Sequence, residues 1–172
     1  MKEEWVTIPE FTMYNISSFG RVFNNRTQKI MKTSHTPHGH VKITLRSDWS
    51  SERFTRSVAK IVAECFVLPP NILCDAVVIL DGNLDNVAAE NLVWRPRWFE
   101  WKYTRQLKEK QPLQYQNLYV YDKIYEQEYD SVIHAGMSVG LLFVDIWRST
   151  YMGNPIFPTG SIFEVNGGNV NV

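Results

Sequence analysis

The segment at residues 57–94 constrains the fold more than any other part of this 172-residue chain. Apolar residues recur at helical spacing along residues 58–66, and the Pro69 and Pro70 pair predicts the end of that helix. An apolar run at residues 76–80 then predicts a strand, and Asp81-Gly82 predicts the turn that follows it. We therefore expect a helix, a strand and a turn in that order.

This order of elements resembles the HNH core of phage and intron homing endonucleases. The matching positions in this chain are Val58, Ile61, Val62, Ala63, Glu64, Phe66, Leu80, Asp81, Gly82, Asn91, Leu92 and Trp94. The resemblance implies a ββα-metal core, the fold on which that family builds its nuclease site.

The chain departs from the family at the positions that carry the chemistry. The first histidine of the family pattern falls on Ala59, the catalytic histidine on Ile79, and the metal ligand before it on Val78. Metal-assisted cleavage needs oxygen or imidazole ligands and a group that activates water, and residues 76–80 supply neither. We expect Asn91 to cap a short helix, since one amide cannot hold a divalent cation. These departures predict a degenerate nuclease that is not an enzyme, with no catalytic residues, no metal and no cofactor.

One alternative keeps the nuclease activity. Asp75, Asp81 and Asp85 lie near the lost positions in the sequence, and together with Asn91 they offer a relocated set of oxygen ligands. This hypothesis predicts metal-dependent DNA cleavage that an Asp85→Ala change abolishes.

Residues 3–45 alternate apolar and polar side chains in short runs between turns, which predicts small antiparallel strands. The stretch is similar to the nuclease-associated modular domain that precedes many phage HNH cores, and the resemblance implies a β module that helps position DNA. The matching positions are Trp5, Ile8, Phe11, Tyr14, Ile16, Ser17, Gly20, Arg21 and Val22, with Gly39 and the strand from His40. His35, His38 and His40 fit no standard zinc spacing, so we expect a structural or solvated loop there.

Charge is distributed unevenly along this chain of zero net charge. Residues 1–60 carry ten Lys or Arg against five acids, and residues 95–117 carry six against two. Residues 61–94 carry five acids and no Lys or Arg. DNA affinity scales with the phosphates that a basic face neutralises, so the two basic blocks predict duplex binding. The acidic centre and the acidic C-terminal residues favour a second hypothesis, a protein-binding inhibitor or host-takeover factor with a host protein as partner.

Residues 95–117 interleave basic and aromatic side chains. We expect a helix over residues 98–110, which Pro112 stops, in a linker between two modules. Such a segment suits tracking along a DNA backbone, and it equally suits a solvated helix whose Trp and Phe side chains face a core.

Residues 118–166 predict a second unit in which two short helices joined by a glycine turn lie between strands. The unit resembles the small DNA-binding repeat at the C-terminal end of homing endonucleases. The matching positions are Tyr119, Val120, Tyr121, Asp122, Ser131, Ala135, Gly140, Ile162, Phe163 and Val165. We expect the second helix to offer Arg148, Ser149, Thr150 and Tyr151 as groove contacts, with Arg148 as the residue that contacts a base or phosphate.

The sequence thus predicts an α+β protein with an antiparallel β module and HNH-like core at residues 1–97. A basic aromatic linker helix at 98–117, a helix-turn-helix repeat at 118–166 and a tail at 167–172 follow. We expect an inactive, phage-encoded protein that binds double-stranded DNA in the host cytoplasm as a regulator or site competitor. No apolar run is long enough for a membrane span. The predicted DNA contacts are Arg21, Arg26, Arg46, Arg53, Arg56, Arg95, Arg97, Lys102, Arg105, Lys108, Arg148 and Thr150.

Overall fold

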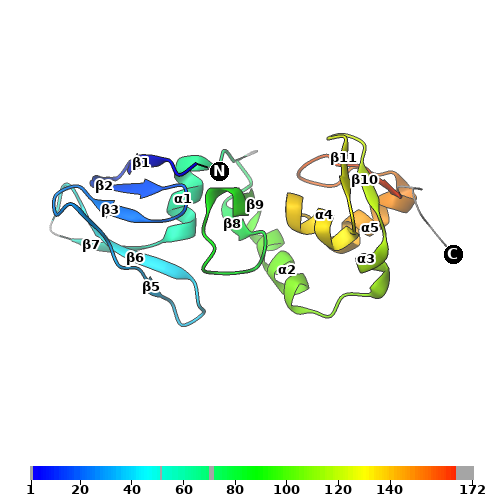
Figure 1. The fold of residues 1–172 in the computed structure, drawn as a ribbon, viewed down its shortest axis with the longest axis horizontal. Helices are drawn as coiled ribbons and strands as arrows, with labels where there is room; N and C mark the ends of the chain where they lie inside the picture. The colour runs from blue at the N-terminus through cyan, green and yellow to red at the C-terminus, as the bar shows by residue number, and fades with distance from the viewer. Residues whose placement is uncertain (1, 51, 70–71, 166–172) are drawn as a thin grey trace. The chain divides into compact units, whose positions relative to one another are not determined.

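The computed structural model describes residues 2–50, 52–69 and 72–165, and the chain divides into two compact units, Met1–Trp94 and Arg95–Val172 (Figure 1). The architecture is a mixed α+β fold with antiparallel sheets, as the sequence predicts. The expected tail at 167–172 lies outside the described residues, as does Pro70. Within the described part of the chain, no helix combines the length and the apolar character that a membrane span requires.

The two larger sheets of the first unit are antiparallel, with strand orders β1-β2-β3-β4 and β5-β6-β7 (Figure 1). Their strands are β1 (Trp5–Ile8), β2 (Phe11–Ser17), β3 (Val22–Asn24), β4 (Lys29–Ile30), β5 (Ser34–His35), β6 (Val41–Arg46) and β7 (Arg53–Ser57). Both sheets contribute to one core, because Ile16 and Val22 from the first sheet and Ile43 and Leu45 from the second belong to the same buried cluster.

Helix α1 (Val58–Phe66) packs into this core through Val58, Ala59, Ile61, Val62 and Ala63. Ser57 caps its first turn, because the Ser57 hydroxyl accepts a hydrogen bond from the amide of Lys60 at 3.4 Å. Trp94 Nε1 donates to the carbonyl of Val67 at 2.7 Å and holds the end of the helix against the strand β9 (Leu92–Arg95). The predicted helix is confirmed, and it ends before the prolines.

Strand β8 (Ala76–Ile79) pairs with strand β9 (Leu92–Arg95), and a 3-10 turn, η1 (Ala89–Asn91), leads into β9. The prediction that Asn91 caps the start of a helix was wrong, since Asn91 is the last residue of η1. The physical reason is that the Asn91 side chain bonds to the preceding turn, at Asp81 and Asn86, rather than to amides that follow it.

The second unit combines an antiparallel sheet of order β11-β10-β12 with packed helices. Its elements are α2 (Arg97–Lys108), α3 (Leu113–Asn117), β10 (Val120–Asp122), β11 (Gln127–Tyr129), α4 (Val132–Val139), α5 (Phe143–Met152) and β12 (Phe163–Val165). Ser131 caps α4, and Gly140 ends it in the left-handed conformation with φ 66°, so both predicted helix boundaries hold. Gly136 permits close packing of α4 on α5, because a Cβ at this position would lie 2.5 Å from the Phe143 ring.

Helix α2 packs within the second unit instead of forming a free linker. Phe99 and Tyr103 lie on one helical face, are fully buried and stack at 6.2 Å between ring centroids. Gln106 Oε1 accepts from the amide of Phe143 at 2.9 Å, and Gln106 Nε2 donates to the carbonyl of Leu141 at 3.2 Å. The helix that we expected at 98–110 therefore helps to position α5.

Candidate nucleic-acid interface

One face of the β5-β6-β7 sheet carries only polar and basic side chains at its paired positions. Val41, Ile43 and Leu45 of β6 are buried, so the alternate residues of the strand point to the opposite face. Antiparallel pairing places partners on the same side of the sheet. This outer ribbon face consists of Ser34, Lys42, Thr44, Arg46, Arg53, Thr55 and Ser57.

The strongest concentration of positive charge on the outer ribbon face is the cross-strand pair Arg46 and Arg53, at one end of the β6–β7 register. Both side chains are exposed, and no carboxylate belongs to this face. The next pair along is Thr44 and Thr55, whose hydroxyls lie 3.0 Å apart. Like charges directly opposite each other destabilise a strand pair, and an anion bound between them would relieve that repulsion.

Sequence reasoning named Arg46 and Arg53 but missed the other members of this face, including Lys42. The available signal was the alternation His-Val-Lys-Ile-Thr-Leu-Arg at residues 40–46, which already places Lys42, Thr44 and Arg46 on one side of a strand. The partner positions on β7 required the register, which only the structure supplies.

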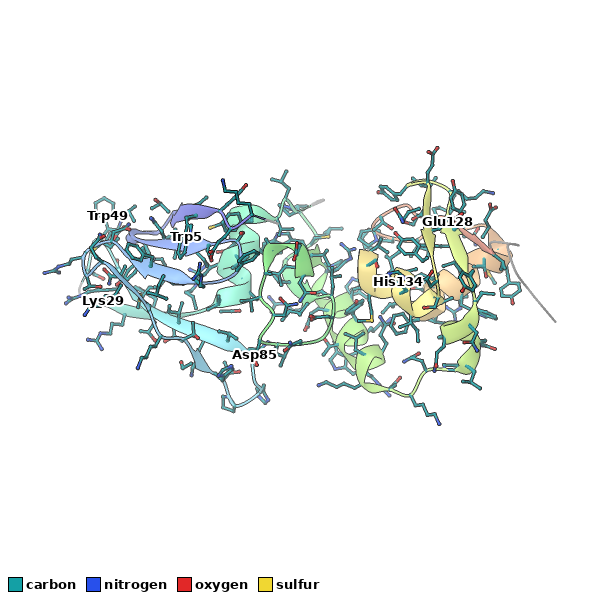
Figure 2. The ribbon with its side chains drawn as sticks, in the orientation of Figure 1. Trp5, Lys29, Trp49, Asp85, Glu128 and His134 are labelled. Carbon is teal, nitrogen blue, oxygen red and sulfur yellow. The ribbon has the colours of Figure 1, made fainter. Side chains whose placement is uncertain are left out.

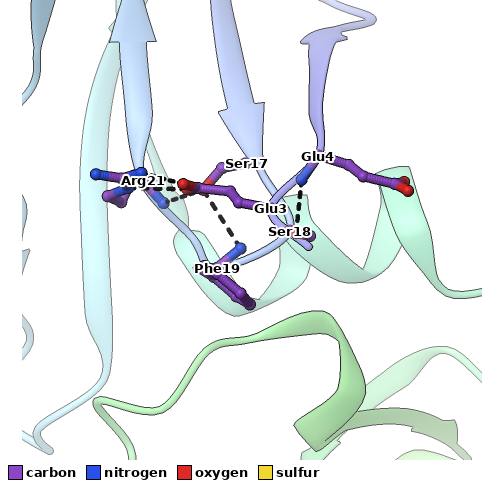
Figure 3. A network of polar contacts seen from close by, with 6 residues as sticks. All are labelled: Glu3, Glu4, Ser17, Ser18, Phe19 and Arg21. Carbon is purple, nitrogen blue, oxygen red and sulfur yellow. Dashed lines mark hydrogen bonds and ion pairs between the residues drawn. The ribbon is translucent and has the colours of Figure 1, made fainter. Parts of the chain in front are cut away.

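Two other predicted arginines of the first unit have carboxylate partners. Arg21 Nε donates to Glu3 Oε1 at 2.8 Å, and a second contact joins the same two groups (Figure 3). The hydrogen bond to Glu3 raises the pKa of Arg21, and the same bond lowers the pKa of Glu3. Arg56 lies 2.9 Å from Glu10 and 3.2 Å from Glu64. These arginines support the module, whereas Arg26 lies in the exposed turn after β3.

The predicted contact Arg95 is a structural residue. Its side chain is buried, Nε donates to the carbonyl of Gly140 at 3.0 Å, and Nη2 donates to the carbonyl of Val139 at 2.5 Å. The prediction placed it in a basic linker, but Arg95 is the last residue of β9, and its hydrogen bonds to the C-terminal end of α4 hold the guanidinium in a buried position. We therefore remove Arg95 from the candidate interface.

The solvent face of α2 pairs cations with exposed indole rings. Lys102 Nζ lies 5.2 Å from the centre of the Trp98 ring, and the Arg105 guanidinium lies 5.4 Å from that of Trp101. Arg105 also pairs with Glu109 at 2.6 Å. Arg97 and Lys108 are the remaining predicted contacts on this helix, and both are exposed.

The second helix of the predicted helix-turn-helix repeat, α5, holds the four predicted groove contacts. The prediction for Ser149 was wrong, because its side chain is buried and its hydroxyl donates to the carbonyl of Asn154 at 2.9 Å, whereas Tyr151 is exposed. Arg148 is exposed and has only a loose ion pair, with Nη1 3.8 Å from Asp145 Oδ1. Thr150 donates its hydroxyl to the carbonyl of Trp147 at 2.8 Å, so its oxygen remains as an acceptor. Arg148 is thus the basic group that α5 offers to a partner.

The loop after β8 is organised by Asp81. Asn91 Nδ2 donates to Asp81 Oδ1 at 2.9 Å, Asn86 Nδ2 donates to Asp81 Oδ2 at 2.7 Å, and the amide of Asn83 donates to Asp81 Oδ1 at 2.8 Å. Partial burial raises the pKa of Asp81, but these hydrogen bonds outweigh it and hold the pKa below its ordinary value. The carboxylate and Asn91 are therefore committed to the structure of the loop.

The residues at the family positions do not fit a divalent metal. Val78 is buried, Ile79 packs against the hydrophobic core of the first unit, and Ala59 is buried in that core on α1. Among the described residues, no three His, Cys, Asp or Glu side chains gather closely enough to hold a metal ion. The aliphatic side chains at 59, 78 and 79 contribute to packing and supply no atom that could ligate a cation.

A histidine–carboxylate pair joins the β5 strand to the loop between β8 and η1, where Figure 2 places Asp85. His35 Nε2 lies 2.7 Å from Asp85 Oδ1. We expected His35 to belong to a structural or solvated loop and Asp85 to be a relocated metal ligand. Sequence reasoning missed the pair because fifty positions separate its members.

These features describe an α+β protein in which an N-terminal β module and helix α1 are followed by a helical C-terminal unit. Residues 3–46 match the NUMOD4 motif. The structure is similar to one described as "DNA binding and cleavage by the HNH homing endonuclease I-HmuI", with 22% sequence identity and a TM-score of 0.54. The match covers 96% of this chain and 99% of that chain. A comparison with curated protein sequences found no significant match.

The two matches confirm the predicted resemblance to HNH homing endonucleases, by sequence in the N-terminal module and by fold along the chain. They also overturn one prediction. From the aliphatic residues at 78 and 79 we predicted that the chain is not an enzyme, whereas its fold is similar to that of a structure described as a DNA-cleaving HNH homing endonuclease. Those residues show that family ligands are missing from their usual positions, which does not establish loss of cleavage, and we withdraw the prediction.

Proposed function

We propose that this protein binds double-stranded DNA and that the outer ribbon face is its main contact. The observation that carries the proposal is the exposed Arg46–Arg53 pair, two like charges held opposite each other on a face without carboxylates. Phosphates neutralise such a pair with charge-assisted hydrogen bonds. Lys42 and the Thr44 and Thr55 hydroxyls extend the set of donors along the two strands.

A two-stranded ribbon is also one of the elements that the major groove of B-DNA admits, since that groove is about 12 Å wide. An arginine at the groove floor pairs with the O6 and N7 atoms of guanine, and one at its edge pairs with phosphate. The ribbon therefore provides both non-specific and specific contacts. Arg148 on α5 and the cations of α2 supply a second set of contacts from the other unit. Occupancy of a site in this way would allow the protein to regulate that site or compete for it.

The proposal is tested by a gel shift with a short duplex across a series of salt concentrations. Each phosphate contact contributes about 0.9 to the slope of log K against log salt, so the double variant Arg46→Gln, Arg53→Gln should lower that slope by about two. The matched control is Lys123→Gln, which removes a cation that pairs with Glu164 outside the proposed interface. An unchanged slope in the double variant contradicts the proposal. If the unaltered protein does not shift the duplex even at low salt, the DNA-binding proposal is also contradicted and the protein-binding alternative is favoured.

A second candidate function is cleavage of the bound DNA, which the fold likeness and the His35–Asp85 pair favour. A carboxylate within hydrogen-bond distance orients an imidazole, which is one way that a histidine is positioned to serve as a general base. Supercoiled plasmid incubated with the protein and Mg²⁺ or Mn²⁺ tests this function. His35→Ala should abolish nicking while the hairpin variant His38→Ala retains it. Equal nicking by both variants would exclude His35 from the reaction.

A further inference from the structure

A cavity in the second unit has the composition of a base-binding pocket. It measures about 240 Å³ and lies between the first turn of α2, one side of α5 and the segment after Gly153. Trp98, Met152 and Phe157 supply apolar surface, whereas Asp145, Arg148 and Asn154 supply polar groups. Drug-sized ligands occupy sites of about 300–1,000 Å³, so this cavity suits a smaller planar group.

The aromatic side chains of this pocket are available to a ligand. Trp98 is 55% exposed and Phe157 is 49% exposed, although large aromatic residues usually bury most of their surface. The inner side of the same helix is already filled by Phe99 and Tyr103, so Trp98 is not needed to complete the core.

The charges around the pocket favour an anionic chain as the source of that planar group. Lys102 lies over the Trp98 ring, and Arg148 lines the cavity with only a loose 3.8 Å pair to Asp145. Aromatic rings flanked by cations are the arrangement that binds single-stranded nucleic acid, because bases stack on the rings while cations contact phosphates. Asp145 and Asn154 add an acceptor and an amide, which are suited to the hydrogen-bonding edge of a base.

We propose that this pocket binds an unpaired nucleobase, with Trp98 as the stacking platform and Arg148 as the adjacent cation. This inference rests on the proposed DNA binding and adds to it a preference for DNA that carries an unstacked base. An unpaired base costs less to extrude than a paired one, so bulged DNA is the substrate that reveals the preference.

The test compares three labelled DNAs by fluorescence anisotropy: a fully paired duplex, the same duplex with one unpaired base, and the same bulge with an abasic nucleotide. The abasic form matches the bend and flexibility of the bulge without its base. The intact protein should bind the base-containing bulge about 5- to 150-fold more tightly than the abasic one, the range expected for one base–aromatic stack.

Trp98→Ala should remove this preference, and Trp101→Ala is the matched control. Trp101 lies on the same helix, is 60% exposed and has a cation over its ring, but it does not line the pocket. Trp98→Leu provides a second variant that keeps apolar contact while losing the ring, and circular dichroism checks that each variant is folded. Equal affinity for the base-containing and abasic bulges overturns the inference, as does a preference that survives Trp98→Ala or disappears in Trp101→Ala. In those cases binding to the paired duplex still supports the proposed function, whereas failure to bind any of the DNAs at low salt defeats both.

Discussion

Arg46 and Arg53 face each other directly across the β6–β7 strand pair, with the same charge and on the same side of the sheet. The pairing register that brings them together also places Thr44 against Thr55. Opposite-charge cross-strand pairs stabilise a sheet, whereas this pair opposes its formation. Without a bound anion, this like-charge pair therefore lowers the stability of the β6–β7 strand pair.

Replacing one of the two arginines should therefore raise stability and lower DNA affinity. We expect Arg53→Gln to increase the free energy of unfolding by about 0.2–1 kcal/mol, because it removes the like-charge repulsion. Urea denaturation at low ionic strength measures the gain, and added salt should reduce it by screening. Arg26→Gln, a change at an exposed turn, is the control. A loss of stability in Arg53→Gln would show that Arg53 makes favourable contacts in the free protein.

Removal of the Asn91 side chain should destabilise the first unit. Asn91 is buried, accepts from the amide of Asp81 at 3.2 Å and donates to Asp81 Oδ1 and to the carbonyl of Asn86. Leaving these groups without partners costs about 1–3 kcal/mol. Thermal melting of Asn91→Ala gives the loss, and Asn83→Ala, at an exposed position in the same loop, should change stability much less.

The Asp81 network should make stability depend on acid. The folded pKa of Asp81 lies below the ordinary value of 3.8, so its contribution is fully present above about pH 5 and is lost as pH falls through the folded pKa. Unfolding free energies measured from pH 6 downward should thus fall more steeply in the unaltered protein than in Asp81→Asn. Parallel curves for the two proteins would mean that Asp81 gains nothing from Asn86 and Asn91.

Gly136→Ala should destabilise the second unit, although alanine normally stabilises a helix relative to glycine by about 1 kcal/mol. The added Cβ would lie 2.5 Å from the Phe143 ring and 3.0 Å from the carbonyl of Leu141. Overpacking of this kind costs about 1–3 kcal/mol. Ser138→Ala, on the exposed side of the same helix, should instead be neutral or slightly stabilising. Chemical denaturation of both variants compares them, and a stabilised Gly136→Ala would refute the close packing of α4 on α5.

Arg95 should behave as a folding residue. Arg95→Ala removes the hydrogen bonds to the carbonyls of Val139 and Gly140, so we expect it to lower the unfolding free energy by about 1–3 kcal/mol. The DNA affinity of the folded variant, measured well below its melting temperature, should match that of the unaltered protein. Reduced affinity with unchanged stability would return Arg95 to the interface.

The order of elements was predictable because it depends on local signals. The Ser57 and Ser131 caps and the left-handed Gly140 act within a few residues, and the alternation in β6 is visible in the sequence itself. The role of Asn91 was not predictable, because asparagine is equally suited to cap a helix and to hydrogen-bond to the backbone and side chains of a loop. Which amides lie within its reach depends on how the turn after Asp81 folds back on η1.

The candidate site was predicted only in part for the same reason. The sequence shows where basic residues cluster along the chain, but it does not show which of them reach solvent. In the structure Arg95 is buried, and Arg21 and Arg56 pair with carboxylates. Only the structure shows that Arg46 and Arg53 remain on an open face. Partners such as His35 and Asp85 are distant in sequence, and no local pattern indicates that they meet.

By itself the sequence determined the α+β class, most of the succession of helices and strands, with α3 and the role of Asn91 as exceptions, and the resemblance of its N-terminal module to a nuclease-associated motif. Tertiary structure alone decided which arginines stay in solvent, which strand positions face each other and which cavity Trp98 and Arg148 line together. The reason is that capping and hydrophobic periodicity act over a few neighbouring residues, whereas burial and strand register arise only when distant segments pack together.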